Sequence, residues 1–185
     1  VEQLQKHMAK LVVGPALDAD SQIGPVASDV QLAENLRYLA LGQEEGAELL
    51  CGGELLELKT PGHFMQPALF VKSQNSMVIN QEEMFAPIAS VISVDSYEEG
   101  LATVNDTKFG LTSGIITRSL ARANHFRRHA RTGCVMVNLP TAGTDYHVPF
   151  GGRGDSSYGS REQGQYAVEF YTTVKTAYVA QGEPE

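Results

Sequence analysis

Three short segments in the second half of the chain have the composition of buried strands, and helical segments separate them. The strand candidates are IASVISV (88–94), SGIIT (113–117) and CVMVN (134–138). The intervening residues 96–106 and 119–133 have apolar positions at helical spacing. Strands that are apolar on both faces and alternate with helices are typical of a parallel sheet covered by helices. The pattern predicts an α/β fold, a three-layer αβα arrangement around an open, mostly parallel sheet.

Two more amphipathic helices are predicted before these strands, over residues 1–14 and 28–49. Ser28 or Asp29 supplies the N-cap of the second one. Basic residues fill the last turns of the helix over 119–133, where they face the negative end of its dipole, and Gly133 is its predicted C-cap. Three of these cations, Arg127, Arg128 and Arg131, are therefore interpreted as a solvated helix end.

Charge and cysteine content exclude several classes of protein. Lys and Arg number 14 against 22 Asp and Glu, a formal charge of −8, so binding to nucleic acid is not expected. No apolar run approaches the roughly 18 residues that span a bilayer, so no membrane association is expected. Cys51 and Cys134 are too few for a disulfide scaffold and suit a reducing, cytoplasmic location. No metal site is predicted.

A loop over residues 138–164 follows the last predicted strand and is longer than a simple connection. It carries Tyr146, His147 and Phe150, and its glycines match neither of the phosphate-binding loop patterns. Ligand lining and a purely structural loop both remain open. His147 is either a general base or a packing or hydrogen-bonding residue, and no nucleophile motif lies near it.

The tail EFYTTVKTAYVA (169–180) is β-prone and alternates as a strand does. An unpaired strand of this kind is an aggregation hazard that proteins normally pair or cover. We expect self-association into a homo-oligomer through residues 170–180, with a frayed tail as the alternative.

Five motifs in order resemble the aldehyde dehydrogenase superfamily: EEMFAPI, NDTKFGLTSGIIT, GCVMVN, VPFGG and YTTVKTAYV. The resemblance covers essentially the whole chain. The run NLPTAGTDYHVPFGG followed by SSYGSREQG is most similar to the α-ketoglutaric semialdehyde (2,5-dioxovalerate) dehydrogenase branch. The resemblance implies a catalytic-domain portion over 1–164 and a C-terminal helix and oligomerisation strand over 165–185.

The resemblance also implies site residues. Glu83 matches the glutamate that hydrogen-bonds the nicotinamide ribose hydroxyls, and Phe85 the ring that packs by the nicotinamide. Leu111 resembles another nicotinamide contact, and Phe150 the aromatic residue at the inner end of the aldehyde tunnel. Tyr146 and His147 lie in the stretch that matches the substrate-entry loop.

Two residues beside Glu83 and Phe85, Ala86 and Glu82, are interpreted separately. Ala86 stands where the family usually has glycine. This replacement requires a backbone conformation at position 86 that alanine tolerates. Glu82 is interpreted as a solvated acid or a helix-capping partner.

The implied reaction is oxidation of a small aldehyde to a carboxylate with NAD or NADP, through a cysteine thiohemiacetal and a glutamate base. Cys51 and Cys134 match family positions that are not the nucleophile. We therefore expect the nucleophile, the base and the nucleotide domain to lie upstream, no catalytic residue in this chain, and an inactive fragment. The alternative is a non-catalytic α/β module for binding or assembly.

Overall fold

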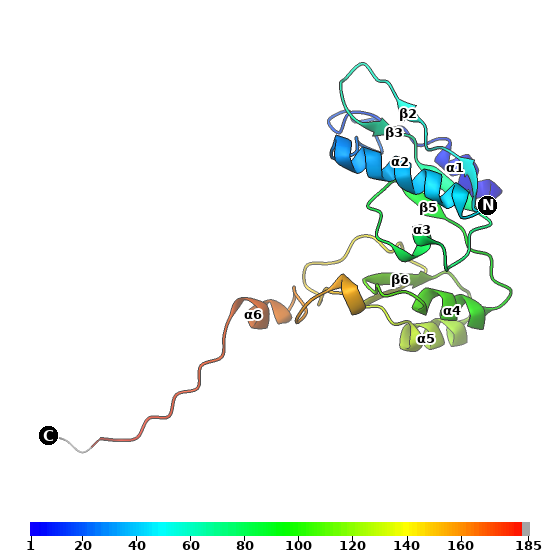
Figure 1. Ribbon diagram of the computed structural model, residues 1–185. Coiled ribbons are helices and arrows are strands. Elements are labelled where there is room, and N and C mark those ends of the chain that lie inside the picture. The colour runs from blue at the N-terminus through cyan, green and yellow to red at the C-terminus, as the bar shows by residue number, and fades with distance from the viewer. Residues whose placement is uncertain (183–185) are drawn as a thin grey trace. The chain divides into compact units, whose positions relative to one another are not determined.

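The computed structural model describes residues 1–182 and divides the chain into two compact units, Val1–Glu99 and the residues from Gly100 onward (Figure 1). The helices are α1 (Glu2–Met8), α2 (Asp29–Glu44), α3 (Val78–Gln81), α4 (Tyr97–Asn105), α5 (Leu120–His129) and α6 (Tyr166–Tyr171), with a 3-10 turn η1 (Gly154–Ser156). The strands are β1 (Glu48–Cys51), β2 (Leu55–Leu56), β3 (Phe64–Met65), β4 (Ala68–Val71), β5 (Ile88–Ser90), β6 (Thr112–Ile115) and β7 (Cys134–Val137). None of the described helices has the length and apolar character needed to cross a bilayer.

The first unit is built on a three-stranded sheet in the order β1-β4-β5. β4 lies in the centre, antiparallel to β1 and parallel to β5, and Ala68, Leu69 and Phe70 are fully buried there. β2 and β3 form a separate antiparallel pair. The core around β4 also takes in Tyr38 and Leu39 of α2, so the helix and the sheet bury their apolar faces against each other.

The second unit contains the parallel pair β6–β7, in which Thr112 is opposite Cys134 and Ile115 is opposite Val137. Phe126 of α5 is buried in this unit. At the edge of the pair, the hydroxyls of Ser113 and Thr132 are 2.7 Å apart and hydrogen-bonded, so the two buried polar groups satisfy each other.

The predicted α/β class is confirmed, and the sheets are mixed as well as parallel. The prediction of one helix over 28–49 is wrong at its end. Ser28 does cap α2, since its side chain accepts a hydrogen bond from the Gln31 amide, but the helix stops at Glu44. Gly46 has a φ of 97°, which a helix does not allow, and the chain then enters β1.

Three further predicted bounds are corrected. The first helix ends at Met8, and β5 is shorter than the strand expected over 88–94. Gly133 is not a C-cap, because α5 ends at His129 with Ala130 as its cap. A Cβ on Gly133 would overlap the Gly151 carbonyl, so this glycine is needed for a close backbone approach. Arg131 consequently lies beyond the helix rather than in its last turn.

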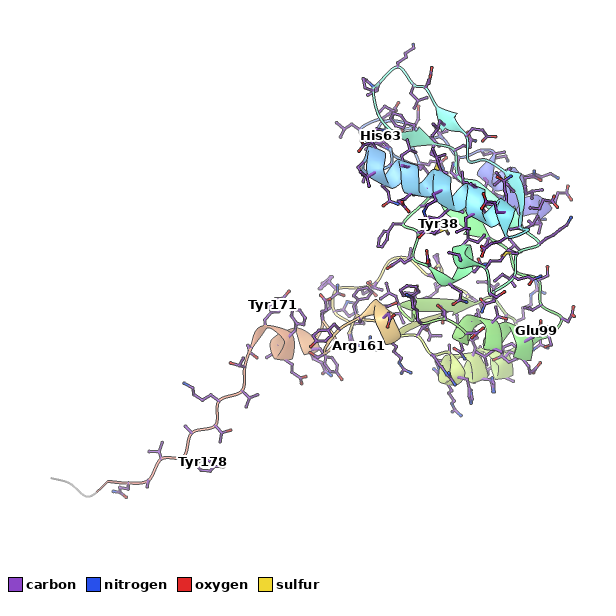
Figure 2. The ribbon with its side chains drawn as sticks, viewed as in Figure 1. Tyr38, His63, Glu99, Arg161, Tyr171 and Tyr178 are labelled. Carbon is purple, nitrogen blue, oxygen red and sulfur yellow. The ribbon has the colours of Figure 1, made fainter. Side chains whose placement is uncertain are left out.

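In the structure of a single chain, the tail does not form the predicted strand. Phe170 and Tyr171 belong to α6, and residues 172–182 are assigned to neither helix nor strand. The side chains of Val174, Tyr178 and Val179 are more than nine-tenths exposed. Figure 2 shows Tyr171 at α6 and Tyr178 on the extension that follows it. The predicted range 165–185 includes residues 183–185, which lie outside the described residues.

Candidate functional site

The EEMFAP segment forms the connection from α3 to β5, and both of its ends are fixed by backbone hydrogen bonds. The Glu82 amide donates to the Val78 carbonyl at 2.9 Å, which continues α3 by one residue. At the other end, the Ala68 amide of β4 donates to the Pro87 carbonyl at 2.9 Å. The segment therefore starts at a helix and leads into β5, and the central strand β4 holds its last residue, so both of its ends are fixed.

Alternate residues of this segment are held against α2. The Tyr38 hydroxyl donates to a carboxylate oxygen of Glu82 at 2.8 Å, and the Gln31 amide nitrogen donates to the Met84 carbonyl at 3.0 Å. Figure 2 shows Tyr38 on α2. The residues between and after these anchors, Glu83 and Phe85, are exposed, and Phe85 is 80% exposed. Anchoring at positions 82 and 84 thus presents the two predicted cofactor residues at the surface.

Phe85 takes up the unusual backbone conformation of the segment. Its φ is +50°. Ala86 stands where the family usually has glycine, but it is not among the residues with positive φ, so its backbone conformation is one that alanine tolerates. A left-handed conformation is uncommon for a bulky residue and costs on the order of 1 kcal/mol or more. An exposed aromatic ring on a strained backbone gains little from packing, so packing does not explain why Phe85 holds this conformation.

A pocket of about 350 Å³ opens beside Phe85 within the first unit. Phe85 and Pro87 line it together with Gln31 and the segment 23–27. The Gln31 amide nitrogen also donates to the side-chain oxygen of Asn35 at 2.8 Å, and Asn35 is fully buried. The wall is thus largely apolar with one fixed amide, a combination suited to a ring-bearing ligand.

Glu82 is exposed, in keeping with its interpretation as a solvated acid, and its carboxylate also has a defined partner. It occupies the C-cap of α3, in keeping with a capping role, and it accepts the hydrogen bond of a nearly buried tyrosine. That hydrogen bond is the main cause that raises the pKa of Tyr38 above its usual value, followed by desolvation of the phenol and the charge of Glu82. Both adjacent glutamates are exposed, and Glu82 is the one that accepts a hydrogen bond from α2.

In the second unit, Leu111 directly precedes β6 and is 39% exposed. Its carbonyl accepts a hydrogen bond from the Cys134 amide at 3.0 Å, which fixes its backbone against the start of β7. Phe150 is half-buried and pairs with Glu162 through two backbone hydrogen bonds of 2.8 and 3.0 Å. The loop after β7 is therefore closed by an antiparallel bridge near its C-terminal end.

The glycine-rich part of this loop is held by polar side chains. Arg161, labelled in Figure 2, donates to the Gly152 carbonyl at 2.8 Å, and the Gly152 amide donates to the Ser157 hydroxyl at 2.6 Å. The Gly110 amide donates to the Ser156 hydroxyl at 3.0 Å. These bonds give the loop a defined structure, and its aromatic side chains remain available to a ligand.

Tyr146 and His147 both lie exposed on this loop, with their rings edge to face at a centroid distance of 5.5 Å. No side-chain hydrogen bond of His147 to a serine or cysteine occurs in the described part of the chain, so the geometry gives it no nucleophile to activate. Cys51 and Cys134 are half-buried free thiols, and each lies in a different unit. Residues 1–182 contain no group of three His, Cys, Asp or Glu side chains placed to hold a metal.

The structure therefore assembles two groups of predicted residues. Glu83 and Phe85 lie together in the first unit, and Leu111, Phe150, Tyr146 and His147 belong to the second. Sequence reasoning missed Gln31, Asn35 and the segment 23–27. Their signal was weak: a glutamine and an asparagine spaced by four on one helix face, after a Gly-Pro turn.

Comparison with known proteins gives a consistent result. The sequence profile of the "Aldehyde dehydrogenase family" matches residues 1–177. The alpha-ketoglutaric semialdehyde dehydrogenase of Bacillus subtilis is 42% identical over 180 residues, and the alpha-ketoglutarate semialdehyde dehydrogenase of Haloferax volcanii is 40% identical over 181. Each alignment covers 96% of this chain and 37% of the relative. The chain thus spans less than two-fifths of the length of these relatives.

Solved structures agree with this match. The crystal structure of a Mycobacterium tuberculosis aldehyde dehydrogenase complexed with NAD+ is 34% identical and superposes with a TM-score of 0.87. The superposition covers 97% of this chain and 38% of that protein. A TM-score of this size over nearly the whole chain means that the two share one fold.

Proposed function

The chain belongs to the aldehyde dehydrogenase family, and on that premise we propose that it is part of an NAD(P)-dependent enzyme that oxidises a small aldehyde to the carboxylate. The observation that carries the proposal is the position of Phe85, an exposed ring held in a left-handed backbone conformation beside an apolar pocket. A core residue would not be placed in this way.

Glu83 and Phe85 are the residues proposed to hold the nicotinamide riboside. An ionised carboxylate accepts hydrogen bonds from two vicinal hydroxyls, and an adjacent aromatic ring gives a flat apolar wall. The exposed Glu83, the exposed Phe85 ring and the largely apolar pocket beside it fit such a group. The bound dinucleotide would supply the hydride acceptor.

Gln31 and Tyr38 act as positioning residues in this proposal. Gln31 reaches from α2 to the Met84 carbonyl, and Tyr38 reaches to the Glu82 carboxylate, so two hydrogen bonds fix the segment. Gln31 also lines the pocket beside Phe85. Reacting groups must be held to within a fraction of an ångström, because small misplacements reduce rates steeply. The anchors therefore determine how accurately Glu83 and Phe85 meet a ligand.

The aldehyde is proposed to contact the loop after β7, with Phe150 at the inner end of its path and Tyr146 and His147 nearer the entry, and Leu111 on the nicotinamide side. The relatives named for α-ketoglutaric semialdehyde favour an aldehyde that also carries a carboxylate, such as 2,5-dioxopentanoate. Recognition of that carboxylate needs a cationic or hydrogen-bonding partner, and His147 is the candidate within residues 138–150.

The 185-residue chain alone is proposed to lack turnover. The Cys134 sulfur does not have the surroundings of an activated thiolate, because it lies 3.9 Å from the Gly151 carbonyl oxygen, an acceptor that does not stabilise a negative sulfur. Residues 1–164 would contribute to a catalytic domain, and residues 165–185 would contribute a helix and an oligomerisation strand.

Absorbance at 340 nm tests both parts. The complete gene product should reduce NAD or NADP with a panel of small aldehydes, and 2,5-dioxopentanoate should rank high. The isolated chain should show no turnover. If the complete protein reduces neither dinucleotide with any aldehyde, the proposed activity is wrong. Turnover by the isolated chain that Cys134→Ser or Cys51→Ser abolishes would overturn the claim that the nucleophile lies elsewhere.

A further inference from the structure

Three cationic residues from separate parts of the second unit meet around one short backbone segment. The Arg153 amide donates to the Gly110 carbonyl at 2.9 Å, and the Asp155 amide donates to the Lys108 carbonyl at 2.9 Å. A Cβ on Gly110 would lie 2.8 Å from the Arg131 carbonyl oxygen, so the absence of a side chain lets that segment approach. Lys108, Arg131 and Arg153 are thereby fixed as neighbours.

These three residues line a pocket of about 440 Å³ that is distinct from the pocket at Phe85 and lies wholly within the second unit. Thr107 and Phe109 line it as well, whereas the nearby carboxylates Asp106 and Asp155 do not. Lys108, Arg131 and Arg153 are all exposed, and within residues 1–182 none of them forms a salt bridge.

Three contacts give the pocket a defined wall. The Arg131 amide donates to the side-chain oxygen of Asn105 at 2.7 Å, and the Asn105 amide nitrogen donates to the His129 carbonyl at 2.9 Å, so Asn105 fixes the backbone at Arg131. The Lys108 ammonium lies 5.1 Å from the centroid of the Phe109 ring. The backbone that carries the cations is therefore preorganised, a requirement for selective binding.

Like charges repel, and three unpaired cations around one concave site gain from a counter-charge. In a chain of net charge −8 this local surplus is not a consequence of overall composition. A lone monovalent ion would leave most of the surplus uncompensated. An anion with two charged oxyanion groups could contact more than one cation at once.

We propose that this pocket binds a small polyvalent anion that carries two oxyanion groups, a diphosphate or a dicarboxylate. Lys108, Arg131 and Arg153 supply charge-assisted hydrogen bonds, the Thr107 hydroxyl adds a neutral one, and the Phe109 ring forms an apolar wall. Neither Phe85 nor Glu83 takes part, so the site is independent of the proposed dinucleotide contacts.

Titration calorimetry of the 185-residue chain at low ionic strength tests the proposal, with sodium pyrophosphate and sodium succinate as probes. At least one of them should bind with one-to-one stoichiometry, and which one binds separates the two ligand classes. Lys108→Gln, Arg131→Gln and Arg153→Gln should each weaken binding by about tenfold or more, the loss of one charge-assisted hydrogen bond. Arg127→Gln and Arg128→Gln, the same charge change on exposed positions of α5, should weaken it less than about twofold.

Two calorimetric results would overturn the site. The first is no binding of either probe to the unaltered chain. The second is an equal loss in the α5 control variants, which would mean attraction to net charge only. Circular dichroism establishes that each variant is folded, and amide NMR shifts on titration give an independent measure. They should concentrate at residues 107–110, 131 and 153–154, and shifts confined to other residues would also contradict the proposal.

Discussion

The Tyr38 hydroxyl donates a 2.8 Å hydrogen bond to the Glu82 carboxylate across 44 residues of sequence. Tyr38 is 8% exposed, whereas Glu82 is an exposed residue. The contact therefore runs from the core of the first unit to its surface, and it fixes the residue directly before Glu83. The stability of the first unit and the position of Glu83 should therefore depend on this hydrogen bond.

Tyr38→Phe should reduce the free energy of unfolding by about 1 kcal/mol near neutral pH. This is less than a hydrogen bond to a buried charged group contributes, because the exposed Glu82 carboxylate can regain water. The raised pKa of Tyr38 means that the folded state holds the phenol proton to higher pH than the unfolded state does. This contribution is complete below the unfolded pKa of about 10 and is lost as the pH rises through the folded value. Urea unfolding at neutral and alkaline pH should show a smaller alkaline loss in the variant.

Tyr158→Phe is the matched control, because Tyr158 is fully exposed. It should leave the free energy of unfolding at neutral pH unchanged. If Tyr38→Phe and the unaltered chain lose stability equally between about pH 9 and 11, the hydrogen bond does not shift the phenol's titration.

Glu83→Gln in the complete enzyme should slow the hydride-transfer step and weaken the cofactor, through loss of a charge-assisted hydrogen bond of about 1.5–3 kcal/mol. Glu82→Gln is the control one position earlier. Its amide oxygen can still accept the Tyr38 hydrogen bond, so it should change the hydride step little. Stopped-flow absorbance measures the step. Equal effects of the two changes would remove the distinction between the glutamates.

Phe85→Gly should make the 185-residue chain more stable, by roughly 0.5–1 kcal/mol, because glycine adopts a φ of +50° without strain. Little packing is lost, since the ring is 80% exposed. Phe85→Ala retains a Cβ and should gain less. Thermal melts compare the three chains. The same change should weaken nicotinamide binding in the complete enzyme, and a Phe85→Gly chain that is less stable would mean that the ring packs in solution.

Phe150→Ala should change the ranking of aldehyde substrates in the complete enzyme more than it changes cofactor affinity. The two backbone hydrogen bonds to Glu162 do not depend on the ring and should survive. Leu139→Ala, at an exposed position of the same loop, is the control. kcat/KM across an aldehyde series measures the ranking. A uniform loss across all aldehydes that follows a lower melting temperature would identify Phe150 as a core residue.

Truncation after Tyr171 should convert a self-associating chain into a monomer, because it removes the exposed extension and leaves α6 intact. Truncation after Ala180 is the control and should still associate. Sedimentation velocity gives the masses. If all three chains sediment as monomers, and the amides of residues 172–180 exchange freely, the tail is frayed and does not pair.

Local signals in the sequence were sufficient for much of the fold. Ser28 and Asp29 were the two predicted cap candidates of α2, and Ser28 caps it, since a side chain that accepts from an amide three residues later needs only its immediate neighbours. The strands β6 and β7 were predicted from their apolar segments, and they pair in parallel. The EEMFAP motif indicated Glu83 and Phe85 by residue type and order, although the assignment of their roles stays a prediction.

Contacts between distant segments decided the rest. The partner of Glu82 lies on α2, the role of Gly133 depends on the Gly151 carbonyl, and the cations around Gly110 come from three parts of the chain. Periodicity reports which face of an element is buried, but it carries no information about which remote group will lie against it. The sequence by itself therefore determined the class of fold and the identity of the motif. Only tertiary packing determined which carboxylate is anchored, which aromatic ring is exposed, and where unpaired charges gather.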